Sequence, residues 1–248
     1  MWPRGRHRCV VPAIRVAAAG DLHASEEHRE RITHAFGELP ERADVVLLAG
    51  DLTTHGLPEQ ADVIADACRL VAPLPVVAVL GNHDHHSGRQ QEIAATLRAA
   101  GAVVLESDHL VLELGGIEVG DASTKGFVGG FPGAEIADFG EALLREVYAE
   151  TSREVTALEQ GLEAISGCHK RLVLLHYAPI SETLAGEPEG IWAFLGSGRL
   201  AGPIGAHRPD AVFHGHAHHG RPRGAIGEVP VWNVARHVTG EDFAIVEI

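Results

Sequence analysis

Short aliphatic segments, each followed at once by a polar cluster, recur along the chain and most constrain its fold. Residues 15–19 precede GDLHAS, residues 43–49 precede GDLTTHG, and residues 76–80 precede GNHDHHSG. Such segments are typical of buried strands, because they are short, apolar and bounded by turn residues. The intervening stretches 57–72 and 89–100 carry apolar residues at helical spacing. This alternation predicts strand–helix–strand units and an α/β fold with parallel strands.

The sequence after residue 100 is predicted to form one long helix and further strands. Apolar residues in steps of three and four predict a helix over about 137–165, and residues 103–119 are predicted to form strands that turn at Gly115 and Gly116. Further strands are predicted at 171–175, 211–213, 229–234 and 243–248. The sequence shows no internal repeat and no linker-like tract, so we expect a single domain over residues 1–248.

Charge and histidine content narrow the range of partners. The formal net charge is −14 at pH 7, which opposes binding to duplex nucleic acid, because such proteins usually carry basic surfaces that displace phosphate counterions. The longest apolar runs have only the length of a strand, so we expect no membrane-spanning helix. The chain has 17 histidines, which suggests metal binding or pH-sensitive chemistry.

Cysteine usage and the N-terminus indicate a cytoplasmic protein. The three cysteines, Cys9, Cys68 and Cys168, lie far apart and form no C-x-x-C pair, which argues against disulfides and a thiolate zinc site. The basic segment 1–16 resembles the start of a signal peptide, but Pro12 and Arg15 interrupt its apolar part. We therefore expect reduced, structural cysteines and no cleaved leader.

The polar clusters all follow predicted strands at their carboxyl ends. They contain Asp21 and His23; Asp51; Asn82, His83 and Asp84; His176; and His214, His216 and His218. Taken alone, each fragment has an ordinary explanation: Asp51 could cap a helix, and the GNHD sequence could be a turn. In an α/β sheet, however, the carboxyl ends of the strands line one crevice. The five clusters are therefore expected to converge on one site.

Side chains of these types suit metal ions. Carboxylate, imidazole and amide oxygen without thiolate suit manganese, iron, zinc or magnesium, and the share of histidine favours transition metals over calcium. The set exceeds the four ligands of one tetrahedral zinc ion, so two ions that share a carboxylate are the economical arrangement. Two ions roughly 3.5 to 4 Å apart can hold a phosphoryl group between them and activate a water as the nucleophile.

Together, the motifs D-x-H, GD, GNHD, a lone His176 and GHAH resemble the full motif set of the calcineurin-like metallophosphoesterases. The resemblance spans residues 21–218. It implies a two-sheet β-sandwich flanked by helices. It also implies roles for the individual residues. One metal ion would be held by Asp21, His23 and His218, the other by Asn82, His176 and His216, and Asp51 would bridge the two ions. His83 would contact the phosphate and assist the leaving group, and Asp84 would orient His83.

We therefore expect a phosphoesterase with a metal-bridging hydroxide that hydrolyses a small phosphodiester or a phosphomonoester, the diester being preferred. The alternatives are a nuclease, a non-catalytic metal-binding scaffold, and a structural α/β domain with chance histidines. Little length remains for a cap domain, so an open site is expected. The sequence leaves open the oligomeric state and whether substrate contacts come from His85, His86, His214, Lys125, Tyr177 or Arg199.

Overall fold

Two large sheets form the centre of the computed structural model, which describes residues 12–248, so Cys9 and most of the basic N-terminal segment lie outside the described residues. The first sheet has the order β13-β1-β2-β3-β4, with β13 Ala244–Glu247, β1 Arg15–Ala19, β2 Val45–Ala49, β3 Val76–Val79 and β4 Val103–Val104. Strands β1 to β4 run parallel, and β13 pairs antiparallel with β1. All three strands predicted in the first third of the sequence are therefore confirmed as one parallel unit.

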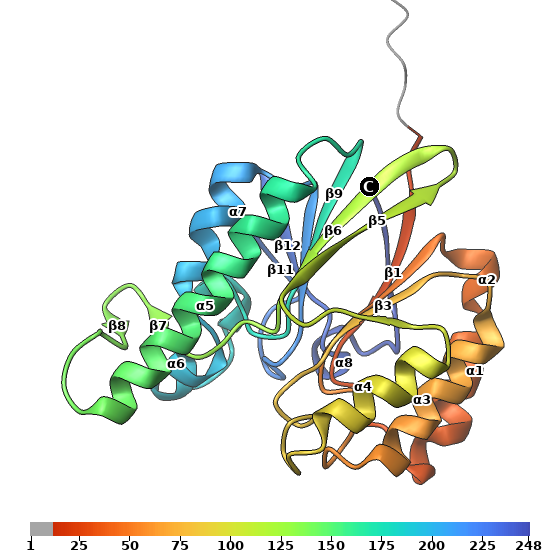
Figure 1. Ribbon diagram of the computed structural model, residues 1–248, viewed down its shortest axis with the longest axis horizontal. Coiled ribbons are helices and arrows are strands. Elements are labelled where there is room, and N and C mark those ends of the chain that lie inside the picture. The colour runs from red at the N-terminus through yellow and green to blue at the C-terminus, as the bar shows by residue number, and fades with distance from the viewer. Residues whose placement is uncertain (1–11) are drawn as a thin grey trace, which may run out of the picture.

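The second sheet has six strands in the order β11-β12-β10-β9-β6-β5. Their bounds are β11 Arg223–Ile226, β12 Val229–Asn233, β10 Ala211–His214, β9 Lys170–Leu174, β6 Ile117–Ser123 and β5 Asp108–Leu114. The four inner strands are parallel, and the two edge strands are antiparallel to their neighbours. A separate two-stranded hairpin, β7 Gly130–Phe131 and β8 Ala134–Glu135, projects from the body of the molecule (Figure 1).

Helices cover the outer face of each sheet, which makes a four-layered sandwich (Figure 1). The first sheet is covered by α1 Arg29–Gly37, α3 Pro58–Val71 and α4 Gln90–Ala99, with the short α2 Leu39–Arg42 beside them. The second sheet is covered by α5 Ala142–Ala164 and α7 Ala201–His207. Short helices lie in the loops: α6 Trp192–Leu195, α8 Arg236–Thr239, and the 3-10 turns Glu26–His28, Ser181–Leu184, Glu189–Ile191 and Gly198–Leu200. The predicted two-sheet β-sandwich flanked by helices is confirmed.

The alternation of side chains along the strands builds the core. Val16 and Leu47 point into the space between the sheets, where they meet residues such as Phe213. Their neighbours Ala17 and Val46 point the other way, toward the helices of the first sheet. The inner strands are apolar on both faces because both faces are covered.

Some elements differ from the sequence-based expectation. Helix α5 begins at Ala142 rather than near residue 137. Helix α1 was not predicted, because it buries only Ile32 and Phe36 and so lacks a continuous apolar stripe. Edge strand β11 was also missed, since its residues are only partly buried. Within residues 12–248, no helix combines the length and the apolar composition that crossing a bilayer requires.

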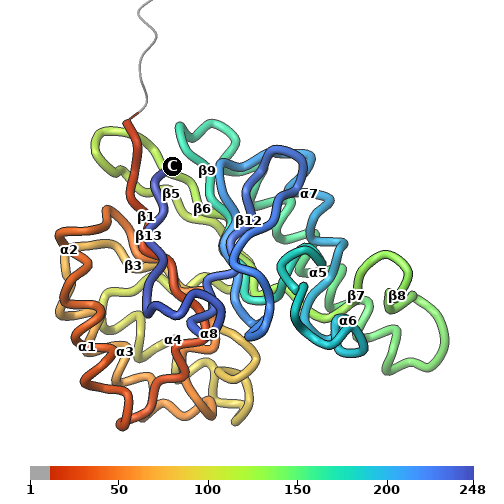
Figure 2. Tube along the Cα trace, turned by 180° about the vertical axis from the view of Figure 1, so that it is seen from behind, coloured from red at the N-terminus to blue at the C-terminus, as the bar shows by residue number. Residues whose placement is uncertain are grey.

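The last residues of the described chain lie beside its first residues. Strand β13 pairs with β1, and Ala235, just before α8, forms a bridge with Gly20 at the end of β1 (Figure 2). The segment around α8 is thereby brought next to the loop that follows β1. This placement matters for the site described next.

Candidate metal centre

The loops at the carboxyl ends of β1, β2, β3, β9 and β10 bring the predicted ligands together. The predicted ligands form three groups, and within each group the donor atoms lie within 4.8 Å of one another. The groups are Asp21–His23–His218, His23–Asp51–His83 and Asp51–His176–His216. Asp51 and His23 each belong to two groups, so the three groups form one continuous cluster. Asn82 joins the cluster through its side-chain oxygen, which lies 2.8 Å from His176 Nε2.

Asp21 is held from two directions. Its Oδ1 lies 2.8 Å from His218 Nε2, and its Oδ2 accepts a 2.8 Å hydrogen bond from the backbone N–H of His216. Burial would raise the pKa of Asp21, but the hydrogen bond from His218 and the nearby charge of His176 outweigh it and bring that pKa to about 2. Asp21 is therefore an ionised, buried carboxylate.

Asp51 lies at the centre of the cluster. Its Oδ1 lies 3.4 Å from His176 Nε2, its Oδ2 lies 4.0 Å from His83 Nε2, and its side chain is 1% exposed. Burial raises its pKa, and the nearby charge of Asp21 adds to this effect, although His176 and His83 act in the opposite direction. A carboxylate between two sets of imidazoles has the placement of a bridging ligand.

Acceptor atoms of Asn82 and Asp51 converge on the ring of His176. Its Nδ1 lies 2.8 Å from the carbonyl oxygen of Ala49, so this nitrogen donates and the Nε2 of the neutral ring presents a lone pair. That lone pair faces Asn82 Oδ1 at 2.8 Å and Asp51 Oδ1 at 3.4 Å, which are both acceptors. Acceptors that converge in this way are satisfied by one cation, either a metal ion or a second proton on the His176 ring. The donor set therefore fits a metal ion.

The other histidines are also suited to bind metal as neutral rings. Burial lowers the pKa of His23 to about 4 and that of His216 to about 3. Both rings are thus unprotonated near neutral pH and have lone pairs available. The exception is His218, whose pKa is raised by its hydrogen bond to Asp21 in the metal-free protein.

Glycines beside the ligands allow the loops to approach closely. A Cβ on Gly81 would lie 2.2 Å from Asp51 Oδ1, and one on Gly215 would lie 2.3 Å from Asp21 Oδ2. A Cβ on Gly50 would lie 2.5 Å from His176 Nδ1. The glycine that precedes each ligand in the GD, GN and GH motifs is therefore a spatial requirement.

Four predicted ligands have left-handed backbones. The φ angles are 57° for Asp21, 45° for His23, 50° for Asp51 and 70° for His216. Outside glycine, this region costs roughly 1 kcal/mol or more per residue, and such residues cluster at functional sites. The loops are thus held in strained turns that aim the side chains inward.

His83 and Asp84 play different structural parts. His83 Nδ1 lies 2.7 Å from the carbonyl oxygen of Thr54, and its side chain is 42% exposed. Asp84 is fully buried and accepts hydrogen bonds from the backbone N–H groups of Leu52, Thr53 and Gly81. The ring of His83 is thus oriented directly by Thr54, while Asp84 holds the loop that precedes Thr54.

The family profile of the calcineurin-like phosphoesterases matches residues 14–220. The chain belongs to this family. It is accordingly a metal-dependent phosphoester hydrolase, and the clusters of His and Asp described above could hold metal ions. A search of curated proteins finds no significant match.

Several solved structures share this fold at low sequence identity. Phosphopantetheinyl hydrolase (PptH) from Mycobacterium tuberculosis has a TM-score of 0.67 and 16% identity, over 93% of this chain and 95% of that one. TT1561 from Thermus thermophilus has a TM-score of 0.58 and 18% identity, over 96% and 99%. A putative 5'-nucleotidase from Staphylococcus aureus, in complex with alpha-ketoglutarate, has a TM-score of 0.56 and 16% identity. The match covers 95% of this chain and 53% of that one.

The residues whose roles the sequence leaves open differ in their distance from the cluster and in their burial. His214 is fully buried, contacts Thr183 Oγ1 at 2.9 Å and does not reach the cluster, while Arg199 donates to Ser152 on α5. Tyr177 packs on the ring of His216 with centroids 4.5 Å apart, and Lys125 lies between Tyr177 and Phe127. His85 is partly buried and His86 is exposed.

Several residues of the calcineurin-like site were not predicted. Thr53 and Thr54, which hold Asp84 and His83, follow the GD motif after Leu52; the hydroxyl group of Thr53 was visible as a local signal, whereas the carbonyl group of Thr54 was not. His237 stacks on His218 with centroids 4.3 Å apart, yet it lies beyond every motif and no sequence signal indicates it. Only the return of the chain toward Gly20 brings it there.

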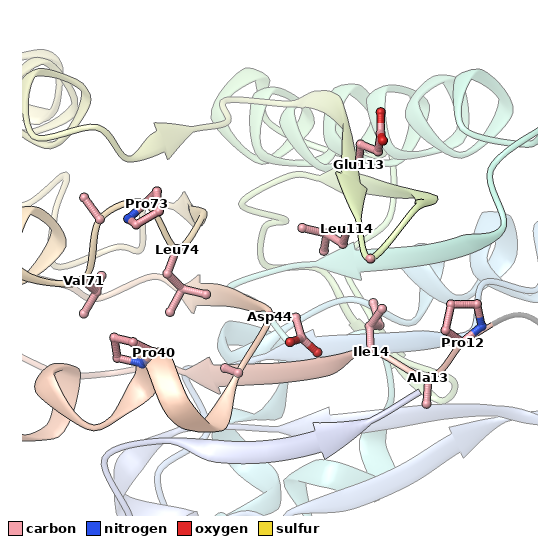
Figure 3. A pocket seen from close by; sticks show the side chains of 13 residues that line it. Pro12, Ala13, Ile14, Pro40, Asp44, Val71, Pro73, Leu74, Glu113 and Leu114 are labelled. Atoms are coloured by element: carbon pink, nitrogen blue, oxygen red, sulfur yellow. The ribbon is translucent and has the colours of Figure 1, made fainter.

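A pocket of about 520 Å³ opens beside Asp21, His23, His83 and His218. A second hollow, of about 550 Å³, lies at the amino-terminal end of the first sheet, beside Ile14, Leu74 and Leu114 (Figure 3). The parallel strands place these two hollows at opposite ends of the sandwich. The second hollow contains no cluster of metal-binding side chains within residues 12–248.

Proposed function

We propose that the protein hydrolyses a small phosphoester at a centre of two metal ions, with Asp51 shared between them. One ion would be held by Asp21, His23 and His218, and the other by Asn82, His176 and His216. Manganese, iron or zinc suits this set of oxygen and imidazole donors. Two bound ions would supply positive charge to the phosphoryl oxygens and would acidify a coordinated water.

The observation that carries this proposal is the meeting of acceptors at His176. With the ring proton on Nδ1, facing the carbonyl oxygen of Ala49, its Nε2 lies 2.8 Å from Asn82 Oδ1 and 3.4 Å from Asp51 Oδ1, which are both acceptors. A structural α/β domain with chance histidines would have no reason to gather these acceptors around one ring nitrogen, because acceptors that face one another without a shared proton are costly. Asp51 and His83 are both present, which also argues against a scaffold that has lost its chemistry.

His83 is the residue placed to act on the leaving group. Its Nδ1 donates to Thr54, so the free nitrogen is Nε2, which lies 4.0 Å from Asp51 Oδ2 at the open side of the cluster. An imidazolium there donates to a phosphoryl oxygen and passes its proton to the departing alkoxide. We propose that Asp84 positions this histidine by holding the 52–54 loop.

The substrate class is a phosphodiester or a phosphomonoester, and we favour a small diester. Two structural neighbours are named as a phosphopantetheinyl hydrolase and a putative 5'-nucleotidase, and identities of 16% show the shared fold alone. A nuclease is the second candidate. The net charge of −14 weighs against it, because binding to a nucleic-acid backbone depends on basic surfaces.

We also propose that residues 1–248 act as one domain, since ligands come from loops of both sheets and a shared core joins the sheets.

Reconstitution with manganese tests the proposed function. The expected result is two bound ions per chain by elemental analysis after dialysis, together with turnover of bis-p-nitrophenyl phosphate and, more slowly, of p-nitrophenyl phosphate. Absence of turnover of both esters by the fully metal-loaded protein would remove the proposal. Steeply salt-dependent binding of single-stranded DNA would favour the nuclease instead.

A further inference from the structure

Two arginines line the pocket beside the metal cluster. The pocket of about 520 Å³ is lined by Asp21, His23 and His218 of the cluster and also by Arg31, Arg236 and His237. Arg31 comes from α1, and Arg236 is the first residue of α8, so helices from opposite ends of the chain build this wall. Neither arginine lies in a motif of the family.

The two guanidinium groups share one carboxylate. Asp242 Oδ1 accepts from Arg236 Nε at 3.0 Å and also from Arg31 Nη1. Both arginines and Asp242 are partly buried, with side-chain exposures of 26%, 39% and 24% for Arg31, Arg236 and Asp242. Within this group of three side chains, two positive charges share one negative charge. Within residues 12–248, the Nη groups of Arg236 donate no hydrogen bond.

Both arginines are attached to the metal-binding loops. Arg31 Nη2 donates to the carbonyl oxygen of Leu22, the residue between Asp21 and His23, at 3.2 Å. The backbone N–H of Arg236 donates to Gly20 at 3.0 Å, and the adjacent His237 stacks on His218. A ligand group that contacts these arginines would therefore lie beside the metal cluster and could belong to the same molecule.

Another cation near the cluster is already compensated. Lys125 Nζ lies 3.9 Å from Glu154 Oε1, and its charge is also countered by Glu150. The pKa of Arg31, in contrast, is lowered by burial and by repulsion from Arg236. An anion between the two guanidinium groups would relieve that repulsion, so the arginine pair is the better anion site.

We propose that the pocket formed by Arg31 and Arg236 binds a second anionic group of the substrate, a phosphate or a carboxylate, while the scissile phosphoryl group lies at the metal cluster. This inference rests on the proposed function and narrows its substrate class to phosphoesters with an additional anion. Guanidinium groups suit both anions, because their N–H donors match the oxygen atoms of a carboxylate or a phosphate in pairs. Asp242 holds the pair together in the free protein and competes with the ligand.

Calorimetric titration with phosphonates that are not hydrolysed tests the proposal. The manganese-loaded protein is titrated with three ligands. Propylphosphonate carries no second anion, 3-phosphonopropionate carries a carboxylate as its second anion, and ethane-1,2-diphosphonate carries a second phosphonate. We expect the second anion to tighten binding by about tenfold or more, as one charge-assisted hydrogen-bonded contact allows. Comparison of the last two ligands distinguishes carboxylate from phosphate.

Three variants assign the effect to the pocket. Arg236→Gln should lose the advantage of the second anion and keep its affinity for propylphosphonate. Arg29→Gln, on the same helix as Arg31 but paired with Glu26 and Asp66 outside the pocket, should behave as the wild type. Asp242→Asn should bind 3-phosphonopropionate more tightly, by about threefold to tenfold, because it removes the competing charge.

The outcomes are distinct. Equal affinity of the wild type for all three phosphonates overturns the inference, and so does an unchanged advantage in Arg236→Gln. Weaker binding in Asp242→Asn would also overturn it, because a purely structural cluster predicts that direction. Turnover is measured separately, so an inactive protein that still discriminates among the phosphonates would overturn the proposed function and leave the anion pocket in place.

Discussion

Asp21 and His218 lie 197 positions apart in the sequence, yet their side chains are 2.8 Å apart. Asp21 follows the first strand of one sheet, and His218 follows β10 of the other sheet. The contact therefore spans the sandwich, and the metal centre is assembled from both sheets at once. Each of the following predictions concerns a part of that assembly.

Gly81→Ala should impair metal binding through a steric effect. The new Cβ would lie 2.2 Å from Asp51 Oδ1 and 2.7 Å from His176 Cε1, so both ligands must move. Overpacking of this kind costs about 1–3 kcal/mol. We expect bound metal to fall and the thermal midpoint to drop. The matched control is Gly167→Ala, whose Cβ has nothing within 4 Å; comparable losses in that control would contradict the steric explanation.

His83→Ala and Asp51→Asn should separate catalysis from metal binding. His83 is 42% exposed at the edge of the cluster, whereas Asp51 is 1% exposed at its centre. We expect His83→Ala to lower turnover by about 10²- to 10⁴-fold while the metal content stays the same. Asp51→Asn should lower both turnover and metal content. Equal loss of metal in the two variants, measured by elemental analysis, would refute this division of roles.

Asp121 should make the protein less stable as pH rises. It lies on β6 with its Oδ1 accepting from Ser123, while its Oδ2 has no partner within residues 12–248. Burial raises its pKa to about 7. Because the folded state holds this proton more tightly than the unfolded state, the contribution to stability is full below pH 3.8 and is lost as pH rises through about 7.

Asp121→Asn should remove that part of the pH dependence. Relative to the wild type, the variant should gain about 2–3 kcal/mol of unfolding free energy between pH 5 and pH 8, measured by urea denaturation. The wild-type comparison cancels titration of the metal ligands, which both proteins share. Parallel stability profiles for the two proteins would show that Asp121 ionises freely in the folded state.

Chelation should destabilise the fold as well as stop turnover. Ions that bind only the folded protein stabilise it by mass action, by about 2.7 kcal/mol when the free metal is a hundredfold above its dissociation constant. For a chain of this size, removal should lower the thermal midpoint by about 5–10 °C. Calorimetry with and without EDTA checks this. Asp51→Asn should respond less, and an equal response would show that the stabilising ions bind elsewhere.

The fold and the convergence of the ligands could be predicted from the sequence because both depend on local patterns. Residues 15–19, 45–49 and 76–79 are short apolar runs that end in polar turns, and parallel strands bring such turns to one edge. The small residues of the motifs are explained by the short distances around Gly50, Gly81 and Gly215. Each of these features depends on only a few adjacent residues.

The arginine pocket could not be predicted because no local pattern encodes it. Arg31 lies on a helix with a sparse apolar face, and Arg236 lies after the last motif. Their meeting at Asp242 depends on the antiparallel pairing of β13 with β1, a contact between the two ends of the chain. The contact between Thr54 and His83 was likewise hidden, since a backbone carbonyl leaves no trace in residue type.

The apolar layer between the sheets has a consequence for the chemistry at its end. Val16 and Leu47 on one sheet meet Phe213 on the other, and the same strands continue into the loops that carry Asp21, Asp51 and His216. Any sliding of one sheet along the other would change the distances between metal-binding side chains that come from different sheets. Phe213 therefore acts on ion affinity from the interior of the protein, without touching an ion, and cavity-forming substitutions there should weaken metal binding before they unfold the chain.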